Sequence, residues 1–285
     1  IFHTYTQYML YIIAAPIGNT KDISLRSIEA IKSVKYIFAE DTRKTSRLLS
    51  DLSIDKPSIR AFHEHNENEV SKKILSYLID DIDIGIMSDA GTPIISDPGF
   101  PLIKLCIENK IPFEVLPGAS SVITALVYSG LPPSSFNFQG FFQKKSIRKD
   151  KDNSIIENYE GSTIFFESPK RLKTTINFLH EKLGNNCEIA ICREMTKKFQ
   201  SIKRGSLKKI AQDLENDEIT CKGEIVIVLS TKREPGENFS LSEEEGKKFL
   251  KYLSTKDASK LIYELYGHNK QSVYKFLSDI SKENI

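Results

Sequence analysis

The segment from residue 82 to residue 109 constrains the fold more than any other part of the chain. Residues 82–87 are an apolar run with the length of a buried strand, and residues 101–109 have the pattern of a helix. Residues 88–99 lie between them and contain two glycines, two prolines, two aspartates and two serines. So many turn-forming residues are costly unless a particular backbone shape is needed. A plain surface turn is the alternative, but the length of the run favours a functional loop at the carboxyl end of a strand, where open α/β sheets bind ligands.

Strand-like and helix-like segments alternate through the first 125 residues. Further segments of strand length occur at residues 10–15, which are almost continuously apolar, and at 36–39, 58–62 and 113–116. Helical patterns follow them, the first with Asp22 as its expected N-cap and the last with Ser120 or Ser121. This alternation predicts a mostly parallel sheet with helices on both faces, whose loops open on one edge. Those loops are residues 16–19, 40–45, 88–99 and 117–121.

The second half of the chain predicts a separate α/β domain with a mixed sheet, followed by a helical tail. Residues 131–135, Leu-Pro-Pro-Ser-Ser, are the expected boundary between the two domains. Strands are expected at residues 163–166, 188–192 and 225–229, with an edge strand at 199–204. Beyond residue 231 the composition shifts to Glu, Lys and Ser, with helices expected at 242–253, 258–266 and 272–277. The predicted parts are residues 1–9 as a leader or added segment, 10–131 and 132–232 as α/β domains, and 233–285 as the tail.

The composition excludes several classes of protein. The 285 residues carry a net charge of only +2, so affinity for nucleic acid has to come from local basic clusters. No apolar run is long enough to span a membrane, and residues 1–9 lack the features of a signal peptide. The four cysteines are scattered, which indicates a reducing, cytoplasmic compartment and no bound metal. The first loop has one glycine instead of the G-x-G-x-x-G pattern, which argues against an NAD dehydrogenase.

Two charged segments indicate contact with a substrate. Residues 40–45, Glu-Asp-Thr-Arg-Lys-Thr, place four charges directly after a strand. They form either a solvated turn, in which Glu40 pairs with Arg43, or an acid and base cluster that faces the substrate. The densest basic run, residues 144–151, follows an aromatic-rich stretch at 136–142. Cations for phosphates and rings for bases are typical of a nucleic-acid-binding edge, so we expect a flexible loop that contacts RNA.

Seven motifs occur in the same order as in a known family. They are Ala15-Pro16-Ile17-Gly18-Asn19, Ala39 to Thr45, Ser88 to Gly99, Pro117-Gly118-Ala119-Ser120-Ser121, Glu167-Ser168-Pro169-Lys170-Arg171, Arg193 to Lys198, and Gly223-Glu224. Each motif is weak alone, but together they extend over residues 9–230. On these residues the chain resembles the tetrapyrrole (corrin/porphyrin) methylase superfamily, and within it the bacterial enzymes that methylate the 2′-hydroxyl of a cytidine ribose in 16S ribosomal RNA.

The resemblance implies a fold of two α/β domains with S-adenosylmethionine folded in the cleft between them, and a homodimer. The implied substrate is the decoding region of 16S rRNA, as free RNA or in the small ribosomal subunit. The implied cofactor contacts are Pro16, Gly91, Thr92, Pro93, Ile95, Ser120, Ser121, Phe166 and Glu224. Relatives that act on small molecules have Gly-Asp-Pro where this chain has Gly-Thr-Pro, so Asp89 is the candidate substitute for the missing carboxylate.

The implied chemistry needs positioning and a base. The sulfonium of S-adenosylmethionine is already electrophilic, so the protein has to place the acceptor oxygen in line behind the methyl carbon. A ribose hydroxyl is a very weak acid, and a general base would contribute about 10²–10⁴-fold. The candidate bases are Glu40, Asp41, Glu194 and, if its pKa is lowered, Lys197. We favour the Glu40–Asp41 cluster, with Arg43 holding a phosphate.

RNA contacts are expected from the basic side chains in and beside these motifs. They are Arg43, Lys44, Arg47, Lys144, Lys145, Arg148, Lys149, Lys170, Arg171, Lys197 and Lys198. Two other functions stay open: a methylase of a small tetrapyrrole-type substrate, and a protein that binds the cofactor without chemistry. The acid and base cluster after the second strand argues against both, and the basic run argues against the first.

Overall fold

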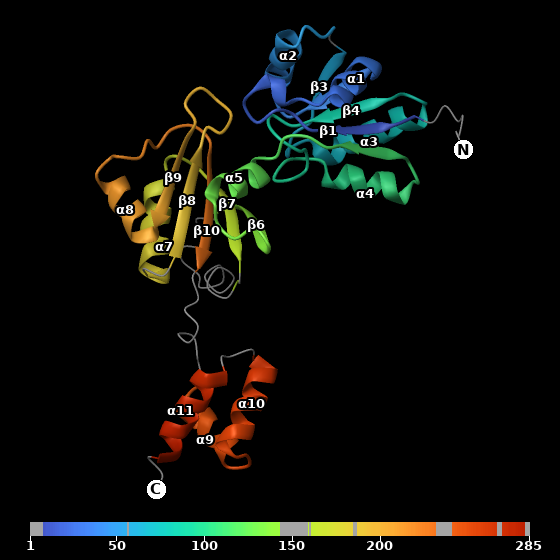
Figure 1. Cartoon of the computed structure of the whole chain (residues 1–285). Coiled ribbons are helices and arrows are strands. Elements are labelled where there is room, and N and C mark those ends of the chain that lie inside the picture. Colours follow the sequence, from blue (N-terminus) through green and yellow to red (C-terminus); the bar gives the residue numbers. More distant parts are fainter. Residues whose placement is uncertain are drawn as a thin grey trace. The chain divides into compact units, whose positions relative to one another are not determined.

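The computed structural model describes residues 8–55, 57–142, 159, 161–184, 187–231, 241–266 and 270–282. The chain forms two compact units, Ile1–Ser230 and Thr231–Ile285. The larger unit contains two five-stranded sheets (Figure 1). The division of residues 10–232 into two domains at residue 131 stays a prediction.

The first sheet is parallel throughout and has the strand order β3-β2-β4-β1-β5. Its strands are β1 (Leu10–Ile13), β2 (Tyr36–Ala39), β3 (Ser58–Ala61), β4 (Ile84–Met87) and β5 (Phe113–Leu116). The helices between them are α1 (Leu25–Ser33), α2 (Thr42–Asp51), α3 (Glu67–Ile79) and α4 (Phe100–Glu108). This confirms the predicted parallel sheet, so the loops after β1, β2, β4 and β5 all lie at one edge.

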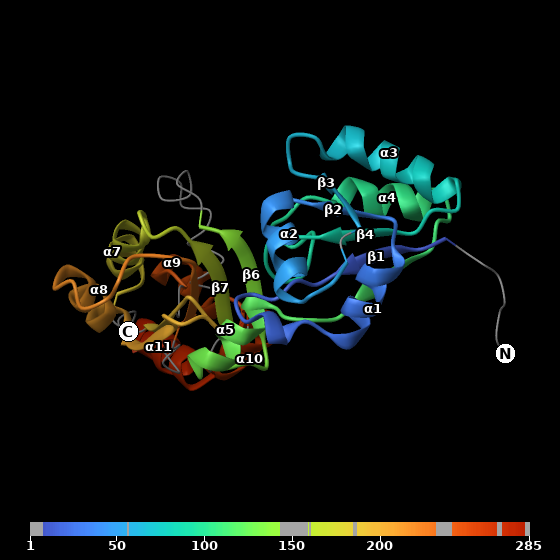
Figure 2. The same cartoon turned by 90° about the horizontal axis from the view of Figure 1, so that it is seen from above.

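Both faces of this sheet are covered, because alternate residues of each strand point to opposite sides. On one side Leu10 and Ile12 of β1 pack in a cluster with residues of α3 and α4. On the other side Ile13 packs in a cluster with residues of α1 and α2. Figure 2 shows α3 and α4 on one side of the sheet and α1 on the other.

The cap expected for the first helix is wrong. Asp22 belongs to a short 3₁₀ turn, η1 (Thr20–Asp22), and Ser24 is the N-cap of α1, with its side chain accepting from the amide of Ser27. The chain makes this extra turn before the helix because Asn19 caps η1 through its own side chain. At the end of the sheet, Ser120 caps α5 (Ser121–Ser129), as predicted.

The second sheet is mixed, as predicted, with the order β6-β7-β10-β8-β9 and β9 at an edge. Its strands are β6 (Phe136–Phe141), β7 (Ser162–Glu167), β8 (Cys187–Arg193), β9 (Ser201–Ser206) and β10 (Ile225–Thr231). The helices α7 (Leu172–Leu183) and α8 (Leu207–Glu215) contribute to the core cluster on one face, and α5 contributes to the core cluster on the other. Because α5 follows β5 of the first sheet and packs on the second, it joins the two halves of the larger unit.

The smaller unit has its own core. It consists of α9 (Glu243–Leu250), α10 (Thr255–Tyr266) and α11 (Lys270–Lys282), in agreement with the three helices predicted for the tail. Ala258, Ile262, Val273 and Leu277 are buried at its centre. Across the described residues of the chain, the helices are too short or too polar to cross a membrane.

Candidate functional site

The loops after β1, β2 and β4 are joined by backbone contacts at the carboxyl edge of the first sheet. Ala15 and Gly91 form an antiparallel bridge, with N···O distances of 2.8 and 2.9 Å in its two hydrogen bonds. The amide of Asp41 donates to Asp89 Oδ1 at 3.0 Å. These contacts follow from the register, since Ala39 of β2 lies opposite Met87 of β4. The motifs that the sequence separates by 48 residues are therefore side by side.

The loop of residues 88–99 has an unusual backbone. Gly91 and Gly99 have positive φ angles, which glycine tolerates, but Ile94 has φ of 78° and Ser96 has φ of 67°. A β-branched residue at positive φ is strained, and such strain persists where the surroundings hold it and a function uses it. The loop is held at its end, where the amide of Gly99 donates to Glu67 Oε2 at 3.0 Å. Its shape supports the prediction of a functional loop.

Asp41, the favoured base together with Glu40, has a different role in the folded chain. It is the N-cap of α2, and its side chain accepts from the amide of Arg43 at 2.9 Å and from the Arg43 guanidinium at 2.8 and 3.0 Å. Hydrogen bonds from the Arg43 side chain hold the pKa of Asp41 far below its usual range. Such a carboxylate is a weak base. Arg43 pairs with Asp41, so the expected alternative in which it pairs with Glu40 is wrong.

Glu40 and Asp97 carry the basic carboxyl groups of this edge. Burial, and then the charge of Asp89, raises the pKa of Glu40 above its ordinary value. Burial, followed by the charge of Glu40, raises the pKa of Asp97 to about 6, although a hydrogen bond with Ser88 opposes this shift. Asp97 was missed in the sequence, where it looked like one more turn residue. A carboxyl group poised near neutral pH is suited to accept a proton.

Lys44 and Asp89 form an ion pair at this edge. Lys44 Nζ donates to Asp89 Oδ2 at 2.6 Å, and this hydrogen bond raises the pKa of Lys44. Asp89 thereby holds Lys44 on one side and the amide of Asp41 on the other. This fixes the start of α2 against the loop after β4.

A second charged cluster comes from the loops after β8 and before β10. Lys197 Nζ lies 3.0 Å from Glu194 Oε1 and 2.9 Å from Glu224 Oε2, while the amide of Glu224 donates to Glu194 Oε1 at 2.8 Å. Burial lowers the pKa of Lys197, but the hydrogen bonds to Glu224 and Glu194 outweigh it and leave the pKa raised. The condition under which Lys197 was a candidate base is therefore not met.

Glu194 is also a poor base in this arrangement. Burial raises its pKa, but the amide of Glu224 and the ammonium of Lys197 outweigh burial and leave the pKa lowered. The cluster depends on close approach of the backbone at Gly223, which has φ of 81°. A Cβ at this glycine would lie 2.5 Å from Glu194 Oε1.

Replacing Gly223 with Ala is therefore expected to lower the free energy of unfolding by about 1–3 kcal/mol, since the methyl group overpacks the cluster and φ is unfavourable. Chemical denaturation measures this change. The matched control is Gly205→Ala in β9, where the nearest atom to the new Cβ lies 3.9 Å away. Equal stability of the two variants would mean that the Glu194 side chain moves to admit the methyl group at no cost in free energy.

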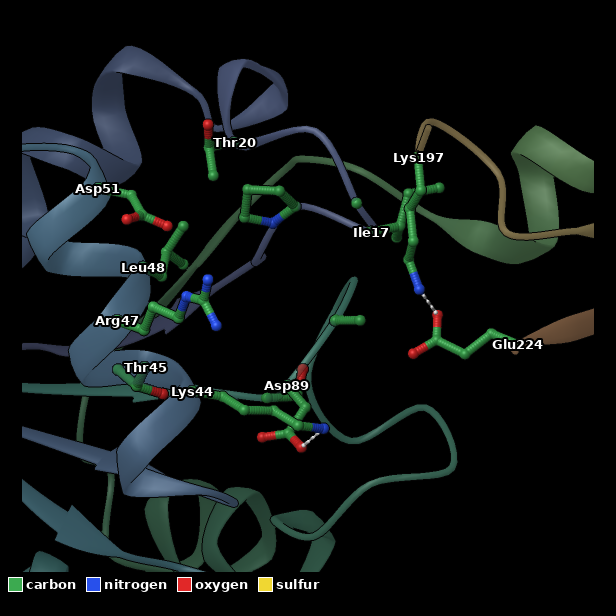
Figure 3. Close-up of a pocket in the computed structure, with 14 residues that line it drawn as sticks. Ile17, Thr20, Lys44, Thr45, Arg47, Leu48, Asp51, Asp89, Lys197 and Glu224 are labelled. Atoms are coloured by element: carbon green, nitrogen blue, oxygen red, sulfur yellow. Dashed lines mark hydrogen bonds and ion pairs between the residues drawn. The ribbon is translucent and has the colours of Figure 1, made fainter. Parts of the chain in front are cut away.

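The two charged clusters form opposite walls of a pocket of about 240 Å³. One wall consists of Lys44 and Asp89, and the other of Lys197 and Glu224 (Figure 3). The Lys197 wall lies against the loop after β1 at Gly18, where an added Cβ would lie 2.5 Å from Thr196 Oγ1 and from Lys197 Cγ. The pocket continues along α2, with Thr45, Arg47, Leu48 and Asp51.

The segments implied for the cofactor lie close together, and their residues are small enough for the main chains to approach one another. A Cβ at Gly91 would be 3.6 Å from the carbonyl oxygen of Ala119, and a Cβ at Gly118 would be 2.7 Å from Ala14 Cβ. Ser120 caps α5 by accepting from the amide of Ile123 at 3.4 Å. Such close packing of main chain, with small residues, fits a ligand that is held through amides and carbonyls.

Phe166 packs against the apolar cluster that contains Ile17 of the loop after β1. It packs edge-on against Phe138 and Phe141, with ring centroids at 4.9 and 5.4 Å. Phe138 and Phe141 belong to β6, as does Gly140. A Cβ added at Gly140 would lie 3.7 Å from Ser96 Oγ of the strained loop. The small residues and main-chain groups of these segments fit S-adenosylmethionine. Individual contacts with the cofactor stay predictions for Pro16, Thr92, Pro93, Ile95 and Ser121.

The residues expected to bind RNA differ in their surroundings. Lys170 is exposed, whereas Arg171 pairs with the buried carboxylate of Glu167 at 2.7 Å. Glu167 also accepts from Thr175 Oγ1 at 2.5 Å and from the amide of Ser168 at 2.7 Å. Arg171 therefore neutralises a buried charge, which is a structural role. The predicted basic loop, with Lys144, Lys145, Arg148 and Lys149, lies outside the described residues.

The fold combines a parallel first sheet, a mixed second sheet and a candidate site at the strand ends of the first sheet. The sequence model of the family described as Tetrapyrrole (Corrin/Porphyrin) Methylases matches residues 9–211. The chain belongs to this family. Among solved structures, it is similar to uroporphyrin-III-C-methyltransferase from Thermus thermophilus, with a TM-score of 0.56 and 14% identity over 78% of this chain and 94% of that one. A similar match to the methyltransferase CobJ has a TM-score of 0.59, 12% identity and coverage of 80% and 96%; both show the fold alone.

Curated relatives are much closer in sequence. The chain is 39% identical over 272 residues to a Haemophilus influenzae protein named Ribosomal RNA small subunit methyltransferase I, covering 94% of this chain and 95% of the relative. It is 42% identical over 221 residues to a Hydrogenobaculum protein of the same name, covering 78% of this chain and 95% of that relative.

Proposed function

We propose that this protein transfers a methyl group from S-adenosylmethionine to small-subunit ribosomal RNA, and that the acceptor is the 2′-hydroxyl of a cytidine ribose in the decoding region. The observation that carries the proposal is the 39% identity over 94% of the chain to a relative named for this RNA. The order of the seven motifs supports the same acceptor. A cytoplasmic location and a homodimer belong to the proposal as well.

S-adenosylmethionine, when bound, supplies an electrophilic methyl carbon. The residues of the chain then have to bind and orient the acceptor and to remove its proton. Glu40 is the base that we propose, because its raised pKa makes it more basic than Asp41, Glu194 or an ordinary carboxylate. Asp97, whose pKa the charge of Glu40 helps to raise, is the next carboxyl group to take the proton. The Lys44–Asp89 pair fixes the loops that carry these groups.

The pocket suits one nucleotide better than a tetrapyrrole. Its volume of about 240 Å³ is below the range of about 300–1,000 Å³ that is typical of pockets for drug-sized ligands, and a four-ring macrocycle is larger still. The lining balances three cations against three carboxylates, which are Lys44, Arg47 and Lys197 against Asp51, Asp89 and Glu224, so its size carries this argument. We therefore use methylation of a small tetrapyrrole only as the comparison reaction in the test below.

The proposal is tested by transfer of labelled methyl groups to small ribosomal subunits, followed by mapping of ribose methylation with and without this protein. We expect one methylated ribose on the small-subunit rRNA that depends on the protein. Transfer to uroporphyrinogen instead would support the small-molecule alternative. Binding of S-adenosylmethionine by calorimetry, without transfer to any RNA, would support a protein that only holds the cofactor.

A further inference from the structure

The part of the pocket that lies along α2 has no role in the chemistry proposed above. We call it the outer wall and define it as Thr20, Arg47, Leu48 and Asp51. Figure 3 shows Arg47 and Asp51 extending from α2 beside Leu48, with Thr20 across the pocket from them. A cation, a carboxylate, a hydroxyl and an apolar side chain thus line one space.

Arg47 and Asp51 are four residues apart on α2, a spacing that allows an ion pair on a helix. Their side chains nevertheless make neither an ion pair nor a hydrogen bond within the described part of the chain. Both groups are solvent-exposed and directed toward the pocket. Their hydrogen-bonding capacity is therefore available to a ligand.

The position of Asp51 has a cost for the helix. It is the last residue of α2, and the last turn of α2 contains no basic residue. The carbonyl end of a helix carries partial negative charge, which disfavours a carboxylate there. The stability of α2 therefore does not explain Asp51, whose side chain lines the pocket.

We infer that the outer wall holds the nucleotide to be methylated, with the Arg47 guanidinium on its phosphate and the Asp51 carboxylate on the exocyclic amine of cytosine. The inference rests on the proposed function and names the residues that select its substrate. Arg suits phosphate because its planar fork donates two parallel hydrogen bonds. A carboxylate accepts from the N4 amine of cytosine, while uracil presents an oxygen acceptor at that position and is repelled. Leu48 supplies an apolar surface for the base.

The base-selecting part of the inference is tested with small subunits reconstituted with rRNA that carries cytidine or uridine at the mapped position. The wild-type protein is expected to prefer cytidine by at least about tenfold in kcat/KM. Asp51→Asn should bring this ratio close to one, because an amide both donates and accepts. The matched control is Glu29→Gln, an exposed acid on α1, which should keep the wild-type ratio.

The phosphate-binding part is tested by the salt dependence of RNA affinity. Arg47→Ala is expected to weaken binding of the cytidine and uridine RNAs equally and to reduce the slope of log affinity against log salt by about 0.7. Lys32→Ala, which removes an exposed cation from α1, should leave the slope unchanged.

The outcomes separate the inference from the proposed function. Wild-type protein that methylates neither RNA contradicts the proposed function. Wild-type protein that methylates the cytidine RNA, with the cytidine preference unchanged in Asp51→Asn and the salt slope unchanged in Arg47→Ala, overturns the inference alone.

Discussion

Replacing Glu40 with Gln is expected to lower the rate of methyl transfer by about 10²–10⁴-fold, the usual contribution of a general base, and to leave the affinity for S-adenosylmethionine unchanged. Glu40 follows β2 directly and lies near Asp89, whose charge is the second cause of its raised pKa after burial. The amide of Gln has almost the same shape but accepts no proton at neutral pH. Single-turnover kinetics with small subunits measures the rate, and calorimetry measures the affinity.

The pH dependence of the rate gives an independent readout. A base works only when it is deprotonated, so the rate should fall as the pH drops through the raised pKa of Glu40. In Glu40→Gln this acid limb should disappear or move lower, because the charge of Glu40 also raises the pKa of Asp97. An acid limb at the same pH in both proteins would assign it to another group.

Asp41→Asn is the matched control for this prediction. Asn is as good an N-cap as Asp, so α2 keeps its first turn while the charge and the pairing with Arg43 are lost. The loss of rate should be small compared with that of Glu40→Gln. A large loss in Asp41→Asn together with a small one in Glu40→Gln would make Asp41 the base, as the adjacent positions in the sequence also allowed.

The fold could be predicted from the sequence because strands and helices both leave local patterns in it. Apolar runs of four to seven residues and helical spacing mark the strands and helices, and a parallel sheet then brings the loops after β1, β2 and β4 to one edge. The pairing of Asp41 with Asp89 through a backbone amide follows from that arrangement. Helix caps are harder to predict, since Asp22 and Ser24 are both good caps and only the extra turn η1 decides between them.

The roles of the charged residues could not be predicted in the same way. The burial of Glu40 and the pairing of Arg43 with Asp41 depend on the path of the chain between β2 and α2. The neighbouring residue types do not specify this path. Lys197 has a raised pKa because Glu224, 27 residues further along the chain, lies beside it. The contacts of the individual cofactor and RNA residues stay predictions for the same reason.

Asp97 shows which signal was overlooked. It follows Ser96 as Asp89 follows Ser88, so the loop of residues 88–99 contains the pair Ser-Asp twice. The positive φ angles at Ile94 and Ser96 occur just before Asp97, which comes within range of Glu40 and Ser88. Such angles at non-glycine residues are not visible in a sequence, but the repeated Ser-Asp pair is.

Replacing Asp97 with Asn is expected to stabilise the folded protein by about 1–2 kcal/mol at pH 7.5 and to slow methyl transfer at the same time. The pKa of Asp97 is about 6 in the folded chain against an ordinary value of 3.8. For an acid with a raised folded pKa, the ionised form costs stability. The cost is absent below pH 3.8, grows between pH 3.8 and about 6, and is complete above. Because Asp97 is only partly buried and water screens its charge, the full cost is about 1–2 kcal/mol.

Denaturant unfolding at several pH values measures this effect. The difference in free energy of unfolding between Asp97→Asn and the wild type should be near zero at pH 3.5 and should reach its full size by pH 7. The exposed Asp22→Asn variant is the control, and its difference should stay within about 0.5 kcal/mol at all pH values. Asn can still accept the hydrogen bond from Ser88, so the loss of that hydrogen bond does not mask the gain in stability. A variant that is less stable than the wild type at pH 7.5 would show that the carboxylate of Asp97 is stabilised by the fold, and the strained loop would then hold it for structural reasons alone.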